Sequence, residues 1–160
     1  MPVSRPHLVA EVVTRTVDST LVIRPVTFDD ADDLAALMVD AYGGALQASS
    51  DEALDGALLE VQKFFGGLYG APILDCSMVA VSPEGLASAS LISRYQGTPL
   101  LAILMTASAW KQRGLARATA QSSVNALAGR GEATLELILT AANRPALELV
   151  DDLHFRDFTV

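Results

Sequence analysis

The chain has 160 residues, of which 51% are hydrophobic, and it carries a formal net charge of −8 at pH 7. The length suits one domain with a sizeable core, and the acidic charge repels nucleic acid and anionic membrane surfaces. Its single cysteine excludes an intrachain disulfide, and with only two histidines we expect no metal site. Without a signal-peptide core, or an apolar run of the about 20 residues that span a bilayer, a cytoplasmic protein is expected.

Two strands and a helix are predicted near the start of the chain. Residues 1–19 form an N-terminal extension with a possible strand over His7–Thr16, where β-branched residues are frequent. A second strand covers Thr20–Val26 and ends at a turn. Asp29 and Asp30 are candidate N-caps of the helix that follows, which a pair of glycines stops.

A second helix follows a polar segment. Residues 42–55 are rich in glycine, serine and acidic side chains, and such segments often shape or cover binding sites. Ser49, Ser50 and Asp51 are candidate caps of the helix. Its apolar stripe is expected to pack into the core rather than to bind a ligand, and it consists of Leu54, Leu58, Val61, Phe64 and Phe65.

The middle of the chain predicts an antiparallel meander. Strands over 77–81, 86–94 and 100–106 are separated by short glycine-containing turns. Cys76 precedes the first of them in an apolar run, which favours a small buried hydrophobe over a catalytic thiol. The alternating Ser88 and Ser90 either line a cavity or face solvent.

The last third of the chain predicts two further helix–strand pairs. A helix over 115–128 ends at glycines suited to a C-cap, and a strand follows over 134–140. A short helix begins near Pro145, and the last strand covers 155–160. The whole order is βαα, βββ, α, β, α, β, which indicates an α+β domain with a mixed sheet.

The stretch Trp110–Ala118 joins a buried strand to a helix and is the most informative feature of the chain. The first N–H groups of a helix have no intrahelical partner and lie at the positive end of its dipole. Gly114 lets the backbone approach a ligand, and Lys111, Arg113 and Arg117 add positive charge. A phosphate-binding turn is one interpretation, and an ordinary connection with solvated basic residues is the other.

Two motifs in order make the chain resemble the GNAT acyltransferase superfamily. The sequence Lys111–Ala116 (KQRGLA) is similar to the family's pyrophosphate-binding turn, with Lys in place of Arg or Gln at its first position. About thirty residues later, Asn143–Ala146 (NRPA) stands where the family has an Asn and, three residues on, an Ala. A short helix then leads to His154-Phe155, with His154 in place of the usual glycine. The resemblance spans about Thr20 to Phe158.

The resemblance implies a single GNAT-like domain over residues 20–160. Its sheet would be twisted, mostly antiparallel and flanked by helices, with central strands 99–107 and 134–140 splayed apart around acyl coenzyme A. Met105, Thr106 and Ala107 would offer backbone groups to the pantetheine arm. Asn143 would contact the cofactor or order the site. The residues expected to hold the pyrophosphate are Lys111, Gln112, Arg113, Gly114, Leu115, Ala116 and Arg117.

The catalytic groups are less clear from the resemblance. In many family members a tyrosine in the short last helix protonates the departing thiolate, and Val150 stands at that position here. Either the thiolate leaves unassisted, or another group serves, or the protein does not catalyse the transfer. Asn143 and His154 are the candidate catalytic residues. Tyr42 and Tyr95 are further candidate acids, and the candidate bases are Asp40, Glu60, Asp75 and Glu136.

These observations predict an N-acyltransferase that uses acyl-CoA, expected to be acetyl-CoA. The acceptor would be an amine of a small molecule or a peptide, to which the acidic segment 42–55 would be attractive. The alternatives are a non-catalytic acyl-CoA-binding or sensing module on the same fold and a purely structural interaction domain. The family usually has a seventh strand, so the strand over His7–Thr16, or a partner chain in a homodimer, is expected to cover the bare sheet edge.

Overall fold

The computed structural model describes residues 7–42, 50–138 and 156–157. Its strands form one sheet in the order β2-β4-β5-β6-β7-β1-β8, with β3 paired to β5 off this path. All neighbouring strands are antiparallel except β6 and β7. The strands are β1 (His7–Glu11), β2 (Val22–Pro25), β3 (Ala71–Pro72), β4 (Met78–Ser82), β5 (Gly85–Tyr95), β6 (Thr98–Thr106), β7 (Thr134–Ile138) and β8 (Arg156–Asp157). The mixed, mostly antiparallel sheet confirms the expected α+β class.

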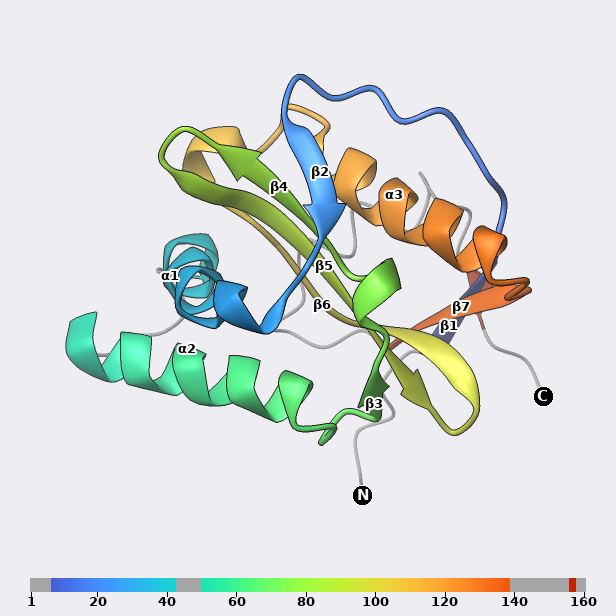
Figure 1. Cartoon of the computed structure of the whole chain (residues 1–160), viewed down its shortest axis with the longest axis horizontal. Coiled ribbons are helices and arrows are strands. Elements are labelled where there is room, and N and C mark those ends of the chain that lie inside the picture. The colour runs from blue at the N-terminus through green and yellow to red at the C-terminus, as the bar shows by residue number, and fades with distance from the viewer. Residues whose placement is uncertain (1–6, 43–49, 139–155, 158–160) are drawn as a thin grey trace.

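Helices cover both faces of the sheet (Figure 1). On one face, α1 and α2 pack on β4, β5 and β6 in a core cluster that includes Phe64 and Leu91. On the other face, α3 packs on β1, β5, β6 and β7 through Val124 and Leu127. None of the described helices has the length and apolarity needed to cross a bilayer. The helices are α1 (Ala31–Tyr42), α2 (Ser50–Phe65) and α3 (Leu115–Gly129), with single 3₁₀ turns η1 (Phe28–Asp30), η2 (Leu74–Cys76) and η3 (Ser108–Trp110).

The central strands β6 and β7 meet at one end only. Their parallel pairing has a single register pair, Leu100 with Glu136. Just beyond it the pairing of β6 with β5 shifts by one residue, because Ile103 faces Leu91 while Leu101 faces Ile92. A bulge of this kind bends a strand and increases its twist. The strand β6 therefore bends at Ala102, and its expected splay from β7 stays a prediction, because β7 is described only as far as Ile138.

The N-terminal strand is part of the main sheet. It lies between β7 and β8 and pairs antiparallel with both. The strand is shorter than expected, because β1 ends at Glu11 and the chain then follows α3. There the side-chain amide of Asn125 exchanges two hydrogen bonds, of 3.0 and 2.8 Å, with the backbone of Arg15, and Gln121 donates to the Val13 carbonyl. These helix contacts replace the strand pairing expected over 12–16, while β1 covers the edge of β7.

The first helical segment begins one turn earlier than expected. Thr27 is the N-cap of η1, and its N–H group donates to the Asp30 carboxylate at 2.8 Å. Asp30 is therefore not the cap but its reciprocal partner, as in a capping box. Arg24 also binds this carboxylate through two hydrogen bonds of 2.8 Å. Asp30 is consequently buried, whereas Asp29 is exposed.

The second helix confirms its expected start and end, and four of the five residues of the expected stripe belong to the core or pack against it. Its innermost residues are Ala53, Ala57, Val61 and Phe64, spaced at three or four positions. Leu54 was assigned to the buried stripe and is 43% exposed. At this end of the helix the buried positions are instead taken by two alanines, Ala53 and Ala57.

Candidate functional site

The turn between β6 and α3 presents backbone donors that have no acceptor among the described residues. Gln112 and Gly114 have positive φ angles of 61° and 76°, and Arg113 between them does not. Such alternation turns successive N–H groups toward one side, which is the backbone form of many anion-binding concavities. Gly114 is the N-cap of α3 and carries no side-chain cap, and the first helical bond runs from the Ala118 N–H to the Gly114 carbonyl. The N–H groups of residues 115–117 thus have no partner within the helix.

The basic side chains of the turn have different tasks. The Arg113 guanidinium lies over the Trp110 ring, 5.2 Å from its centroid, and Trp110 packs beside Leu115. Arg113 and Arg117 are both exposed at the start of α3. Lys111 instead donates to the Ala41 carbonyl at 3.0 Å. This carbonyl lies in the last turn of α1, where helix carbonyls lack partners and a cation is favoured.

Next to this turn, no described residue pairs with the outer edge of β6, the edge that faces β7. The Ala107 N–H donates to the Ala87 carbonyl on β5 at 2.8 Å. In an antiparallel pair every second residue directs its N–H and C=O groups to the neighbouring strand, and the residues between direct theirs to the opposite edge. Thr106 and Leu104 therefore direct their backbone groups away from β5. By the same alternation the backbone groups of Met105 point toward β5, and its carbonyl accepts a hydrogen bond from the Ser88 hydroxyl at 3.1 Å. The Ala107 carbonyl is also occupied, by the Trp110 N–H.

The expected pantetheine positions stay a prediction, and this alternation bears on which of them has backbone groups on the outer edge of β6. Of Met105, Thr106 and Ala107, only Thr106 has its backbone groups on the outer edge, and Leu104 joins it there. The physical reason is the two-residue period of a strand, because consecutive residues cannot serve the same edge. Three residues chosen as a contiguous run therefore include two that are already bonded toward β5.

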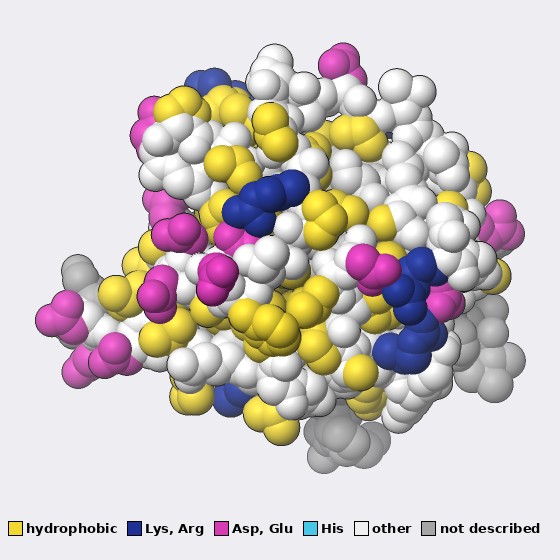
Figure 2. Space-filling view, viewed as in Figure 1, with side chains coloured by type: hydrophobic (Ala, Val, Ile, Leu, Met, Phe, Trp, Pro, Cys, Tyr) yellow, Lys and Arg dark blue, Asp and Glu magenta, His cyan; other side chains and the backbone are white. Residues whose placement is uncertain are grey.

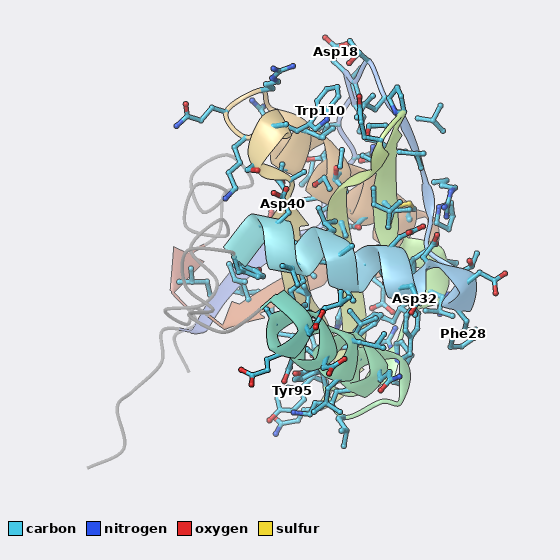
Figure 3. The ribbon with its side chains drawn as sticks, turned by 90° about the vertical axis from the view of Figure 1, so that its left-hand side faces the viewer. Asp18, Phe28, Asp32, Asp40, Tyr95 and Trp110 are labelled. Carbon is cyan, nitrogen blue, oxygen red and sulfur yellow. The ribbon has the colours of Figure 1, made fainter. Side chains whose placement is uncertain are left out.

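The end of α1 is bonded to the same region through three consecutive residues. The Asp40 carboxylate accepts hydrogen bonds from the N–H and hydroxyl groups of Ser108, at 2.8 and 2.7 Å. Ala41 accepts from Lys111, as described above. The Tyr42 hydroxyl donates to the Leu104 carbonyl at 2.8 Å, and burial raises the pKa of Tyr42 to about 12. Figure 3 shows Asp40 and Trp110 toward one end of the molecule and Tyr95 at the other.

Comparison with solved structures identifies this arrangement of strands and turn. A GCN5-related N-acetyltransferase from Sphaerobacter thermophilus superimposes with a TM-score of 0.70 and 15% identity over 96% of this chain, which spans 48% of that protein. The Escherichia coli ribosomal-protein-S18-alanine N-acetyltransferase gives 0.64 and 19%, over 86% of this chain and 79% of that one. The chain has the GNAT fold. The Thermoplasma acidophilum PaiA N-acetyltransferase, a GNAT-like neighbour solved with coenzyme A, gives 0.59 and 12%, over 84% and 88%.

Comparisons of the amino-acid sequence with known proteins assign no family or function to the chain. No protein-family profile matches the chain, and no curated protein matches it. The likeness to GNAT structures therefore rests on the fold, since the identities of 12–19% lie far below those of close relatives. The site must accordingly be argued from the residues of this chain.

Within the GNAT fold, most of the other candidate residues lie away from the turn or are engaged elsewhere. Tyr95 lies where β5 turns into β6, opposite Thr98 and thus at the other end of β6 from Thr106. Glu60 on α2 binds Tyr69 and Lys63, and Asp75 pairs with Arg130 at 2.6 Å. Glu136 is 9% exposed, on β7 where that strand meets Leu100. Among these candidate bases only Asp40 lies next to the turn.

The buried polar residues of the meander are structural. Ser88, Ser90 and Ser93 are completely buried, so neither orientation expected for the first two, toward a cavity or toward solvent, is correct. Ser88 binds Met105 as described, the Ser123 hydroxyl of α3 donates to Ser90 at 2.9 Å, and Ser93 donates to the Tyr69 carbonyl. Cys76 is also fully buried, as expected, and burial raises the pKa of its thiol to about 11, which disfavours a thiolate.

Among the residues that the sequence names for cofactor binding and catalysis, Asn143, Val150 and His154 lie outside the described residues, and so do the expected short helix near Pro145 and most of the strand expected over 155–160. Their expected roles stay predictions. In contrast, the bond between Tyr42 and Leu104 joins residues 62 positions apart and was not expected. The sequence names Tyr42 only as a candidate acid, and the signal that it belongs to the site is its place at the end of the first helix, before the glycine pair.

Proposed function

We propose that the protein is an acyl-CoA-dependent N-acyltransferase, with acetyl-CoA as the acyl donor. The observation that carries this proposal has two parts. The helix α3 has an uncapped N-terminus preceded by positive φ angles at Gln112 and Gly114, and the strand edge that leads to it has no paired strand at Leu104 and Thr106 among the described residues. The first feature suits a pyrophosphate and the second an amide-containing chain.

The pyrophosphate would be held mainly by backbone N–H groups of residues 112–117. Arg113 and Arg117, both exposed beside them, would add charge-assisted hydrogen bonds. Lys111 would contribute its backbone, because its side chain is committed to the end of α1. A cofactor bound there supplies an activated acyl carbon. The pantetheine arm would run along the edge of β6 and pair with the backbone groups of Thr106, whereas the Leu104 carbonyl is already bonded to Tyr42.

The acceptor in this proposal is an amine of a small molecule or a peptide. In the reaction the amine nitrogen bonds to the acyl carbon, the carbon–sulfur bond breaks, and the amine proton ends on the thiolate. Acidic side chains gather over α1 and α2 (Figure 2), including Asp32, Asp33, Asp51 and Glu52 in their first turns. Their negative field favours the approach of a cationic amine.

A non-catalytic module that binds acyl-CoA is the second candidate function. Val150 at the position of the family's proton-donating tyrosine is the observation in its favour. The two functions share the coenzyme A site and differ in turnover. A screen of amines for thiol release from acetyl-CoA separates them, since a binding module releases none above the uncatalysed rate.

The experiment that tests the coenzyme A site is a calorimetric titration of the wild type and of Gly114→Asp with coenzyme A and acetyl-CoA. Aspartate tolerates a positive φ better than most residues, and it places a carboxylate beside the first-turn N–H groups. The carboxylate repels the pyrophosphate and occupies N–H groups that would otherwise bind it. We expect coenzyme A to bind about 10- to 100-fold more weakly, because charge-assisted hydrogen bonds contribute about 1.5–3 kcal/mol. An unaffected affinity would place the ligand elsewhere.

Gly131→Asp is the matched control. Gly131 also has a positive φ, of 80° against 76° for Gly114, and an added Cβ meets no atom within 4 Å at either position. The two substitutions thus bring similar backbone strain and the same charge, but Gly131 lies beyond the other end of α3. Coenzyme A affinity should stay unchanged in Gly131→Asp. If the wild type binds neither ligand, both candidate functions are wrong.

A further inference from the structure

Tyr42 stands at the inner end of the outer edge of β6. The turn that would hold the pyrophosphate follows Thr106, so a chain that runs from the turn along this edge passes Thr106 first and Leu104 next. Its route ends where β6 and β7 pair at Leu100 and Glu136. The Tyr42 hydroxyl is bonded to the Leu104 carbonyl and therefore lies on this route.

Tyr42 is held in place rather than free to swing away. The two residues before it are bonded to the same β6–α3 segment, Asp40 to Ser108 and Ala41 to Lys111. Its ring packs against the core cluster under α1 and α2. The raised pKa agrees with this burial and keeps the phenol neutral, so no charge draws the side chain into water.

We infer that Tyr42 limits the length of the acyl group, so that acetyl is accepted and long chains are excluded. The inference rests on the proposed function, because it takes the donor to lie along the β6 edge. A phenol fixed by three consecutive anchors is a rigid stop, and a packed core yields little to an added methylene. An acyl chain that extends past Leu104 would meet the Tyr42 side chain.

The test is calorimetric titration with coenzyme A, acetyl-CoA, butanoyl-CoA and octanoyl-CoA. For the wild type we expect coenzyme A and acetyl-CoA to bind about equally and octanoyl-CoA to bind at least tenfold more weakly. Tyr42→Ala should reduce this octanoyl penalty to less than threefold. Tyr42→Phe keeps the ring and should keep the penalty, which separates the volume of the side chain from its hydroxyl group.

Two further variants keep the test decisive if Tyr42→Ala does not fold. Tyr42→Leu removes less volume than Tyr42→Ala and should lower the octanoyl penalty in part. Tyr42→Trp adds volume and should extend the penalty to butanoyl-CoA. Tyr69→Ala is the matched control, because Tyr69 is another partly buried tyrosine, bonded to Glu60 of α2 instead of to β6. The octanoyl penalty should be unchanged in that control.

The outcomes separate the two proposals. Wild-type protein that binds acetyl-CoA and octanoyl-CoA equally well would overturn the inference and leave the coenzyme A site intact. A penalty that persists unchanged in Tyr42→Ala and Tyr42→Leu would also overturn it. Wild-type protein that binds none of the four compounds would overturn the proposed function itself.

Discussion

The carboxylate of Asp40 accepts two hydrogen bonds from Ser108, one from its N–H group and one from its hydroxyl. The two residues are 68 positions apart, and their contact fastens the end of α1 to the turn after β6. Asp40 was a candidate base from the sequence. Its two bonds give it a structural role at the place where the turn before α3 and the first helix meet.

Removal of this contact should destabilise the fold in a non-additive way. We expect Asp40→Ala to lower the free energy of unfolding by about 1–2 kcal/mol and Ser108→Ala by about 1 kcal/mol, since the second keeps the N–H bond. The double variant should lose no more than Asp40→Ala alone. Thermal unfolding measures this, at about 2–4 °C per kcal/mol for a chain of this size. Additive losses would show that the two residues act independently.

Lys111 and Arg117 should differ in their effect on coenzyme A. Lys111→Met removes the bond to the Ala41 carbonyl, so it should cost about 1 kcal/mol of stability and change coenzyme A affinity less than twofold. Arg117→Met should leave stability nearly unchanged and weaken coenzyme A about fivefold, or roughly 1 kcal/mol. Denaturant unfolding and calorimetry on the same samples check both. If Lys111→Met weakened coenzyme A binding and Arg117→Met did not, the Lys111 side chain would be the one that binds the pyrophosphate.

Local patterns predicted most of the fold because they carry their own physical cause. The meander, α2 and α3 follow from alternation, helical spacing and glycine stops, and the splay was expected from the resemblance to the GNAT family. The β-bulge opposite Leu91 was not visible, because a run of apolar residues looks alike with or without one extra residue. The sequence also did not predict the early end of β1, since the residues after it bond to Asn125 of α3, which is distant in the sequence.

The candidate site was predictable only where it is made of backbone. The turn at Gly114 needs a residue that tolerates a positive φ, and a glycine at this place in the sequence indicates such a turn. Long side chains give no such signal: Lys111 reaches a carbonyl 70 positions away, and Tyr42 one 62 positions away. Such partners depend on how α1 packs on the sheet, which no motif of the chain specifies.

Trp110 should report ligand binding at the turn. It is the only tryptophan of the chain, so its emission is free of other contributions. Arg113 stacks on its ring, and an anion that draws the guanidinium away would change the surroundings of the indole. We expect coenzyme A to change the fluorescence in a saturable way and pantetheine, which lacks the pyrophosphate, to leave it unchanged. Arg113→Ala should abolish most of the change. An equal response to pantetheine would separate the signal from the phosphates.

The ion pair between Arg24 and Asp30 should govern part of the acid sensitivity of the fold. Hydrogen bonds from the Arg24 guanidinium, and then from the Thr27 N–H, hold the pKa of Asp30 below its usual value. A carboxyl whose pKa is lower in the folded state binds protons more weakly there than in the unfolded chain. Its contribution to stability is therefore complete above the unfolded pKa of about 4 and is lost as the pH falls through the lower folded value.

Asp30→Asn should remove this contribution at every pH above about 4. We expect it to lower the free energy of unfolding at pH 7 by about 1–3 kcal/mol, because the guanidinium and the Thr27 N–H lose a charged acceptor. The wild type and the variant should then converge as the pH falls below about 4, where the unfolded carboxyl gains its proton, and toward the lower pKa of the folded carboxyl. Urea unfolding between pH 7 and pH 3 measures the difference. Asp32→Asn, an exposed aspartate of α1, is the control and should give a difference that varies little with pH. A constant difference for Asp30→Asn over the whole range would contradict the assignment of the pKa shift to Arg24.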